Sequence, residues 1–287
     1  MYIVSFDAIF NENAVVLANR LGVLFMQNMS PKDNDIIIIF GAHNVADKLV
    51  AVKTSLKIEY IIIQTEQYNN RVFDNKYYIE LLTNSVALDW SKLNIKRLKS
   101  HLPTPFYSLY FYDFFVPETT PEFDSRPIDF FFCGSGNKER EKTLLEFKQA
   151  NSEYKMEIDL SYSYTTPATL NEKLSQVKYV INLPYYKDNA LETQRIHKAL
   201  SMGCKVVSLL SADTELNNKY KDFVYFVSHL SDFSLLLEHP PKKTYLQLTE
   251  EFGIHQIRSN IEGIRYAEIK LNEKLKHKEL QNGNSSV

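Results

Sequence analysis

The chain has 287 residues, of which 44% are hydrophobic and 24% are charged, and its formal net charge is −2. This length accommodates two small domains or one large one, and the composition is that of a globular protein with a sizeable core. The near-neutral charge balance excludes a strongly basic nucleic-acid-binding protein, so no nucleic acid is expected among the partners.

The two cysteines, Cys133 and Cys204, both lie in apolar runs. Two cysteines in so long a chain do not make a disulfide framework, and we expect buried thiols in a reducing, cytoplasmic compartment. The N-terminus lacks the basic and long apolar segments of a signal peptide. No apolar run approaches the roughly 18–20 residues that a membrane span needs, so no transmembrane segment is expected. The sequence leaves the oligomeric state open.

Short apolar, β-branched runs alternate with helical patterns along the chain. Several runs are apolar on both faces, which is typical of parallel strands covered by helices. Helices are expected over 167–177, after the N-cap residue Thr166, and over 191–202, before Gly203. The alternation predicts a doubly wound α/β architecture. The expected strands are residues 2–6, 36–40, 60–64, 128–133, 155–159, 179–183, 205–210 and 223–227.

A polar, proline-containing stretch at 116–126 separates two well-patterned regions. We therefore predict an N-terminal Rossmann-like domain over 1–120 and a second one over 121–245. Residues 246–280 are expected to form charged C-terminal helices that pack back across the domains, and residues 281–287 a disordered tail.

The strand expected at 128–133 runs directly into a turn and a helix. Glycines let a backbone approach a ligand closely, and a helix N-terminus offers free N–H groups and a positive dipole end. Such a turn suits a phosphate or diphosphate, and Arg140 adds a charge-assisted contact. It matches neither the Walker A nor the dinucleotide pattern, and a plain turn capped by Asn137 explains it equally well. The turn consists of Gly134, Ser135, Gly136 and Asn137.

The strand expected at 179–183 has Asn182 near its end and leads to Tyr185 and Tyr186, before a helix that opens with Glu192. Ligands of open α/β sheets bind outside the carboxyl ends of the strands. Glu192 is a candidate to bind ribose hydroxyls, and Arg195, one helical turn later, to bind a phosphate. The alternative is an ion pair between the two at i, i+3, which complements the helix dipole.

The strand expected at 60–64 leads into Glu66. A carboxylate at this end of an N-terminal-domain strand is expected to face the cleft between the domains and to act as a general base toward an acceptor hydroxyl. The alternative is a surface glutamate. His43, which also follows a strand, is the weaker candidate for the base. Asp89 is expected to cap a helix or to order the region of Trp90.

In this order, the segments resemble a family of bacterial and viral GT-B glycosyltransferases over about residues 60–210. The resemblance implies two Rossmann-like domains facing a cleft, with the nucleotide-sugar in the C-terminal domain and the acceptor in the N-terminal one. It also implies that the Gly134 turn and Arg140 lie near the diphosphate and Glu192 near the ribose. The residues that carry it are Gln64 to Gln67, Leu88 to Ser91 with Asn94, Gly134 to Asn137 with Arg140, Asn182 with Tyr185 and Tyr186, and Glu192 to Ile196 leading into Gly203 and Val206 to Ser208.

Two departures from glycosyltransferase patterns refine the expectation. Many retaining GT-B enzymes carry two glutamates eight positions apart, but Pro184 stands eight positions before Glu192, which favours an inverting enzyme. The acidic and aromatic residues of Leu88-Asp89-Trp90 stand in a different order from the family pattern, so the resemblance assigns no role to Asp89. GT-B enzymes generally stabilise the departing diphosphate with helix dipoles and basic residues, so neither a metal nor a cofactor is expected.

The predicted function is therefore a hexosyl- or pentosyltransferase that moves a sugar from a nucleotide-diphosphate sugar, such as a UDP-sugar, to a hydroxyl of a glycan or glycoconjugate acceptor. The nucleotide-sugar is a substrate. Two alternatives remain open. One is a Rossmann-fold nucleotide-sugar-modifying enzyme, although no glycine-rich fingerprint follows residues 2–6. The other is a non-catalytic module that binds a nucleotide-sugar or a carbohydrate.

Overall fold

The computed structural model describes residues 1–102, 106–108, 117, 120–161, 163–164, 166–186, 188–233 and 241–249, with 265, 268–269 and 272–273. The chain divides into two compact units. Unit 1 comprises Met1–Phe10, Leu17–Phe111 and His255–Val287, and unit 2 comprises Asn11–Val16 and Tyr112–Ile254. Most of the C-terminal helices expected over 246–280, and the whole tail expected over 281–287, lie outside the described residues.

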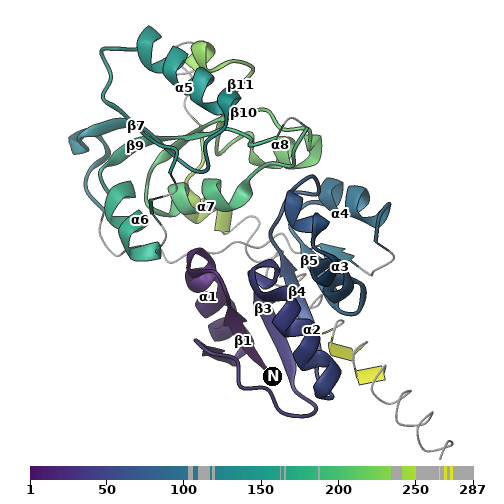
Figure 1. Ribbon diagram of the computed structural model, residues 1–287. Coiled ribbons are helices and arrows are strands. Elements are labelled where there is room, and N and C mark those ends of the chain that lie inside the picture. The colour runs from purple at the N-terminus through teal and green to yellow at the C-terminus, as the bar shows by residue number, and fades with distance from the viewer. Residues whose placement is uncertain are drawn as a thin grey trace, which may run out of the picture. The chain divides into compact units, whose positions relative to one another are not determined.

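Unit 1 is built on a six-stranded sheet in the order β2-β1-β3-β4-β5-β6, in which every neighbouring pair is parallel (Figure 1). Helices alternate with the strands along the chain. The strands are β1 (Tyr2–Ser5), β2 (Leu24–Met26), β3 (Ile36–Phe40), β4 (Glu59–Gln64), β5 (Val86–Asp89) and β6 (Phe106–Ser108). The helices are α1 (Asn11–Leu21), α2 (Ala46–Ser55), α3 (Lys76–Thr83) and α4 (Lys92–Lys99), with 3₁₀ helices at Ala8–Phe10, Ala42–Val45 and Arg71–Asp74.

Both faces of the unit 1 sheet are buried. Ile37, Ile39 and Ile62 project to one face, where they pack with Leu49 of α2 and other helix residues. Ile38, which points to the opposite face, is also fully buried. A parallel strand covered on both faces needs an unbroken apolar run, and this explains why the sequence around β3 reads as one.

Unit 2 is built on a five-stranded parallel sheet in the order β11-β10-β9-β7-β8, drawn in teal and green in Figure 1. The strands are β7 (Ile128–Cys133), β8 (Met156–Asp159), β9 (Val177–Asn182), β10 (Lys205–Leu209) and β11 (Tyr225–Val227). The helices are α5 (Lys138–Ala150), α6 (Pro167–Leu174), α7 (Thr193–Ser201), α8 (Thr214–Tyr220) and α10 (Tyr245–Leu248), with 3₁₀ helices at Phe123–Ser125 and Leu230–Asp232.

The two sheets share one winding pattern. In each, the first strand in sequence lies between the second and the third, so that the direction of winding reverses between β1 and β3 in unit 1 and between β7 and β9 in unit 2. Open α/β sheets bind their ligands at such a switch point, outside the carboxyl ends of the strands. The topology therefore marks one candidate ligand site in each unit.

The α/β class and the two Rossmann-like units agree with the sequence prediction. Each expected strand is present, with ends shifted by a few residues, whereas β2, β5 and β6 were not expected. Val177, expected at the end of a helix, instead begins β9. The helix expected from residue 191 begins at Thr193, with Glu192 as its N-cap residue.

Both cysteines are free. Cys204 is buried as expected, but Cys133, at the carboxyl end of β7, is partly exposed. Burial raises the pKa of each thiol to about 12, so both are protonated at neutral pH. In the part of the chain that the structure describes, no helix is both long enough and apolar enough to cross a membrane.

Candidate functional site

The turn after β7 lies at the switch point of unit 2 and passes close to neighbouring groups at both of its glycines. A Cβ on Gly134 would lie 3.0 Å from Arg195 Nη2, and a Cβ on Gly136 would lie 3.1 Å from the Cβ of Leu160. The backbone N–H of Gly136 donates to the carbonyl of Leu160 at 3.0 Å. Any larger side chain at Gly134 would displace the arginine, so the glycine keeps this side of the site open.

Asn137 joins the turn to the loop after β9. As the N-cap residue of α5, it accepts a hydrogen bond at Oδ1 from the backbone N–H of Arg140 at 2.8 Å. Its Nδ2 donates to the carbonyl of Tyr185 at 2.8 Å. The capping role that the sequence allowed for Asn137 is therefore present, and the same side chain also fixes the position of the tyrosine loop.

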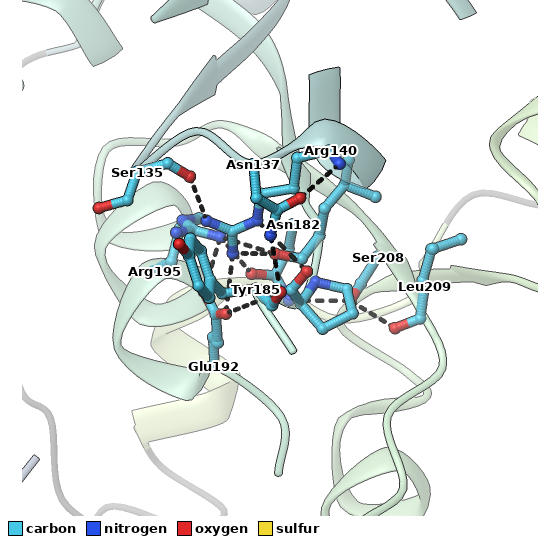
Figure 2. A network of polar contacts seen from close by, with 11 residues as sticks. Ser135, Asn137, Arg140, Asn182, Tyr185, Glu192, Arg195, Ser208 and Leu209 are labelled. Carbon is cyan, nitrogen blue, oxygen red and sulfur yellow. Dashed lines mark hydrogen bonds and ion pairs between the residues drawn. The ribbon is translucent and has the colours of Figure 1, made fainter. Parts of the chain in front are cut away.

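Arg140 has a buried guanidinium, only 4% exposed, that holds the two loops together (Figure 2). It donates to the carbonyls of Ser135, Leu183 and Pro184. Its Nη2 also lies 3.0 Å from Glu192 Oε1. Burial lowers the pKa of Arg140 to about 10, against the opposing effect of Glu192. Arg140 therefore stays charged at neutral pH, and most of its donors are occupied by protein.

Arg195 is the more accessible of the two arginines, with 21% of its side chain exposed. Its Nη1 lies 2.8 Å from Glu192 Oε2 and donates to Asn182 Oδ1 at 3.1 Å. Among the described residues, no acceptor bonds to its Nε or Nη2. The ion pair that the i, i+3 spacing allowed is thus present. It uses Nη1, so the N–H groups of Nε and Nη2 remain available to a ligand.

Glu192 forms an ion pair with each of the two arginines (Figure 2). Besides both ion pairs, it accepts a hydrogen bond from the backbone N–H of Tyr185 at 3.3 Å. Its side chain is 20% exposed. Two guanidinium groups and one carboxylate leave the cluster with one positive charge, which favours an anionic ligand.

Two further groups complete the site. Asn182 donates through Nδ2 to Ser208 Oγ at 2.9 Å, which leaves its Oδ1 facing Arg195. The rings of Tyr185 and Tyr186 meet edge to face at 4.7 Å. The structure thus gathers the unit 2 residues that the sequence singled out around β7 and β9. Sequence reasoning did not assign a role to Ser208, although it belongs to the segment that carries the resemblance.

A second polar cluster lies in unit 1, where His43 and Glu66 follow the neighbouring strands β3 and β4. His43 Nε2 is 3.7 Å from Glu66 Oε1, and the side chains are 13% and 20% exposed. Asn70 Nδ2 donates to Glu66 Oε2 at 2.6 Å. The two residues that the sequence offered as alternative bases therefore form one pair. Gly41, with φ of 66°, starts the turn that carries His43.

Asp89 lies at the end of β5, the next strand of the same sheet, and is fully buried. Its Oδ1 accepts a hydrogen bond from the backbone N–H of Ser91 at 2.9 Å. The N-cap residue of α4 is Ser91, so Asp89 does not cap this helix itself. Asp89 instead orders the segment beside Trp90, the second of the two roles that the sequence suggested.

Comparisons with known proteins give only a distant structural likeness. No protein-family model and no curated protein matches the chain. A solved structure described as a crystal structure of alpha1,3-fucosyltransferase is similar, with a TM-score of 0.42 and 12% identity over 90% of this chain and 80% of that one. A likeness this distant does not establish a shared function.

Proposed function

We propose that the protein is a GT-B glycosyltransferase that moves a sugar from a nucleotide-diphosphate sugar to a hydroxyl of a glycan acceptor. The observation that carries the proposal is the positively charged, glycine-lined switch point of unit 2, where Arg195 keeps donors without an acceptor among the described residues. The order of motifs that resembles GT-B enzymes is independent support. Two Rossmann-like units, each with polar residues at its strand ends, suit a donor and an acceptor.

In this proposal Arg195 binds the donor diphosphate together with the N-terminus of α5. Its Nη2, on the guanidinium edge without an acceptor among the described residues, lies 3.0 Å from the position of a Gly134 Cβ. The first N–H groups of α5 add donors and the positive end of the helix dipole. The net positive charge of the cluster offsets the loss of water around the diphosphate.

Arg140 has a different role from the direct phosphate contact that its sequence position suggested. Its guanidinium donates to three backbone carbonyls, of Ser135, Leu183 and Pro184. We assign it to holding the two loops together and to orienting Glu192. Glu192 in turn holds Arg195 and is our candidate for the donor ribose, while the Tyr185 and Tyr186 rings shape the sugar pocket.

The transfer is proposed as a single displacement with inversion. Glu66 accepts the proton of an acceptor hydroxyl, and the hydroxyl oxygen forms a bond to the anomeric carbon of the donor. The bond from that carbon to the diphosphate oxygen breaks, and its electron pair leaves with the nucleoside diphosphate. Arg195 and the α5 N-terminus stabilise the charge on this leaving group, so the proposal requires no metal. The free thiols fit a reducing, cytoplasmic setting.

A thermal-shift screen tests the donor site. We expect one class among UDP-, GDP-, CMP- and dTDP-sugars to raise the melting temperature by roughly 5–10 °C at a hundredfold excess over its dissociation constant. The shift is expected to persist in EDTA, and inorganic phosphate at the same concentration serves as the control for simple anion binding. A shift only with a nicotinamide cofactor, or none with any nucleotide-sugar, contradicts the proposal.

A further inference from the structure

Glu66 belongs to no helix or strand, yet its backbone is held on both sides by side-chain amides. Its N–H donates to Gln64 Oε1 at 2.5 Å. Its carbonyl accepts from Gln64 Nε2 at 2.6 Å and from Asn94 Nδ2 at 3.0 Å. Gln64 is the last residue of β4 and Asn94 lies in α4, so two separate elements fix this one residue.

Both amides are themselves held by one oxygen of Asp89. Gln64 Nε2 donates to Asp89 Oδ2 at 2.9 Å, and Asn94 Nδ2 donates to the same oxygen at 2.7 Å. All three side chains are at most 1% exposed, so water does not compete for these bonds. Each amide nitrogen therefore bridges the Asp89 carboxylate and the Glu66 carbonyl.

The hydrogen bonds of Asp89 decide which way the amides point. Its Oδ1 accepts from the Ser91 N–H and its Oδ2 from both amides, so the N–H₂ end of each amide must face it. This orientation leaves Gln64 Oε1 facing the N–H of Glu66, and Asn94 Oδ1 accepts from the N–H of Tyr68 at 2.7 Å. A flipped Gln64 would set its oxygen against the Glu66 carbonyl and its amide protons against the Glu66 N–H.

The geometry points to Asp89 as a positioning residue for Glu66. By fixing both amides it holds the Glu66 backbone, and the side chain then stays where His43 and Asn70 meet its carboxylate. The inference rests on the proposed function, in which Glu66 is the base. Asp89 touches neither substrate in this scheme and acts through Gln64 and Asn94.

Asp89→Asn tests the role because it replaces the shared acceptor with an amide of nearly the same shape. We expect kcat for sugar transfer to fall roughly 10- to 100-fold with the donor KM unchanged, since a misplacement of about 1 Å in a catalytic group can cost about 100-fold in rate. In the Glu66→Gln background the same change is expected to alter kcat by less than about twofold, because a residue that acts only through Glu66 has nothing left to position.

Glu59→Gln is the matched control. Glu59 is a buried carboxylate at the other end of β4, where it pairs with Lys53 Nζ at 2.5 Å. This variant likewise changes a buried carboxyl group to an amide, in the neighbouring strand of the same sheet, and is expected to leave kcat as in the wild type. If Asp89→Asn does not fold, Asn94→Ala removes one of the two amides and is expected to lower kcat in the same direction.

Hydrogen exchange of the Glu66 amide provides a readout that needs no turnover. We expect exchange to be at least about tenfold faster in Asp89→Asn than in the wild type or Glu59→Gln, because the bond to Gln64 Oε1 is lost. A wild-type protein that shows no transfer activity would contradict the proposed function. Unchanged Glu66 exchange, or a kcat loss that adds fully to that of Glu66→Gln, would instead overturn the positioning role alone.

Discussion

Arg195→Ala is expected to weaken nucleotide-sugar binding roughly 10- to 100-fold, because a hydrogen bond to a charged group contributes about 1.5–3 kcal/mol. The loss of kcat/KM is expected to be larger, roughly 100- to 1000-fold, because the diphosphate gains charge as the sugar departs. Removing a partly exposed ion pair costs little stability, so the melting temperature falls by only a few degrees. Calorimetric titration with the donor and steady-state kinetics measure the two effects.

Lys178→Ala is the matched control for this change. Lys178 lies in β9 and pairs with Asp129 at 2.9 Å with 23% of its side chain exposed, close to the 2.8 Å and 21% of the Arg195 pair. The Lys178→Ala substitution removes an equal charge from the same unit and is expected to leave donor affinity unchanged. Arg140→Ala, by contrast, is expected to lower both donor affinity and melting temperature, since three backbone carbonyls, that of the buried Leu183 among them, lose their donor. Equal donor affinity in Arg195→Ala and the wild type would refute the assignment of Arg195.

Glu66→Gln is expected to reduce kcat roughly 100- to 10,000-fold while donor affinity and melting temperature stay near the wild-type values. The amide keeps an oxygen that accepts the hydrogen bond from Asn70, so the local structure persists, but it cannot take a proton. Single-turnover kinetics with saturating donor and acceptor isolate this chemical step. Retained thermal stabilisation by the donor shows that the fold and the donor site are intact.

His43→Gln distinguishes the two members of the pair. His43 Nε2 faces Glu66 Oε1 at 3.7 Å, and in our proposal it supports the carboxylate rather than taking the proton. We expect its loss to reduce kcat less than that of Glu66→Gln. A greater loss in His43→Gln would transfer the role of base to the histidine, and full activity in both variants would exclude the pair from the chemistry.

Strand periodicity predicted all five strands of unit 2 and three of unit 1, but not β2, β5 or β6, and it did not predict the strand order of either sheet. The run at β3 is apolar on both faces and longer than three residues, so it stands out in the sequence. The edge strand β2 has three residues, and its first, Leu24, is 71% exposed. Its strand conformation depends on pairing with β1, which no local pattern reveals.

The same limit applies to the candidate site. The spacing of Glu192 and Arg195 allowed their ion pair to be foreseen, because i, i+3 neighbours share a helix face. Strand order is not encoded locally, so His43 and Glu66 remained alternatives until the pairing of β3 with β4 placed them together. Nor does any local signal show that Arg140, in the first turn of α5, donates to the Leu183 carbonyl 43 positions away.

The most direct test of the central claim is mass spectrometry of a glycan library after incubation with the purified protein and the nucleotide-sugar that stabilises it. A glycosyltransferase adds one monosaccharide mass to a particular acceptor and releases an equal amount of nucleoside diphosphate. We expect this product with the wild type and Lys178→Ala, with or without EDTA, and almost none with Arg195→Ala or Glu66→Gln. If donor binding occurs but no acceptor gains mass, or if both site variants form product at the wild-type rate, the protein does not act in the way proposed.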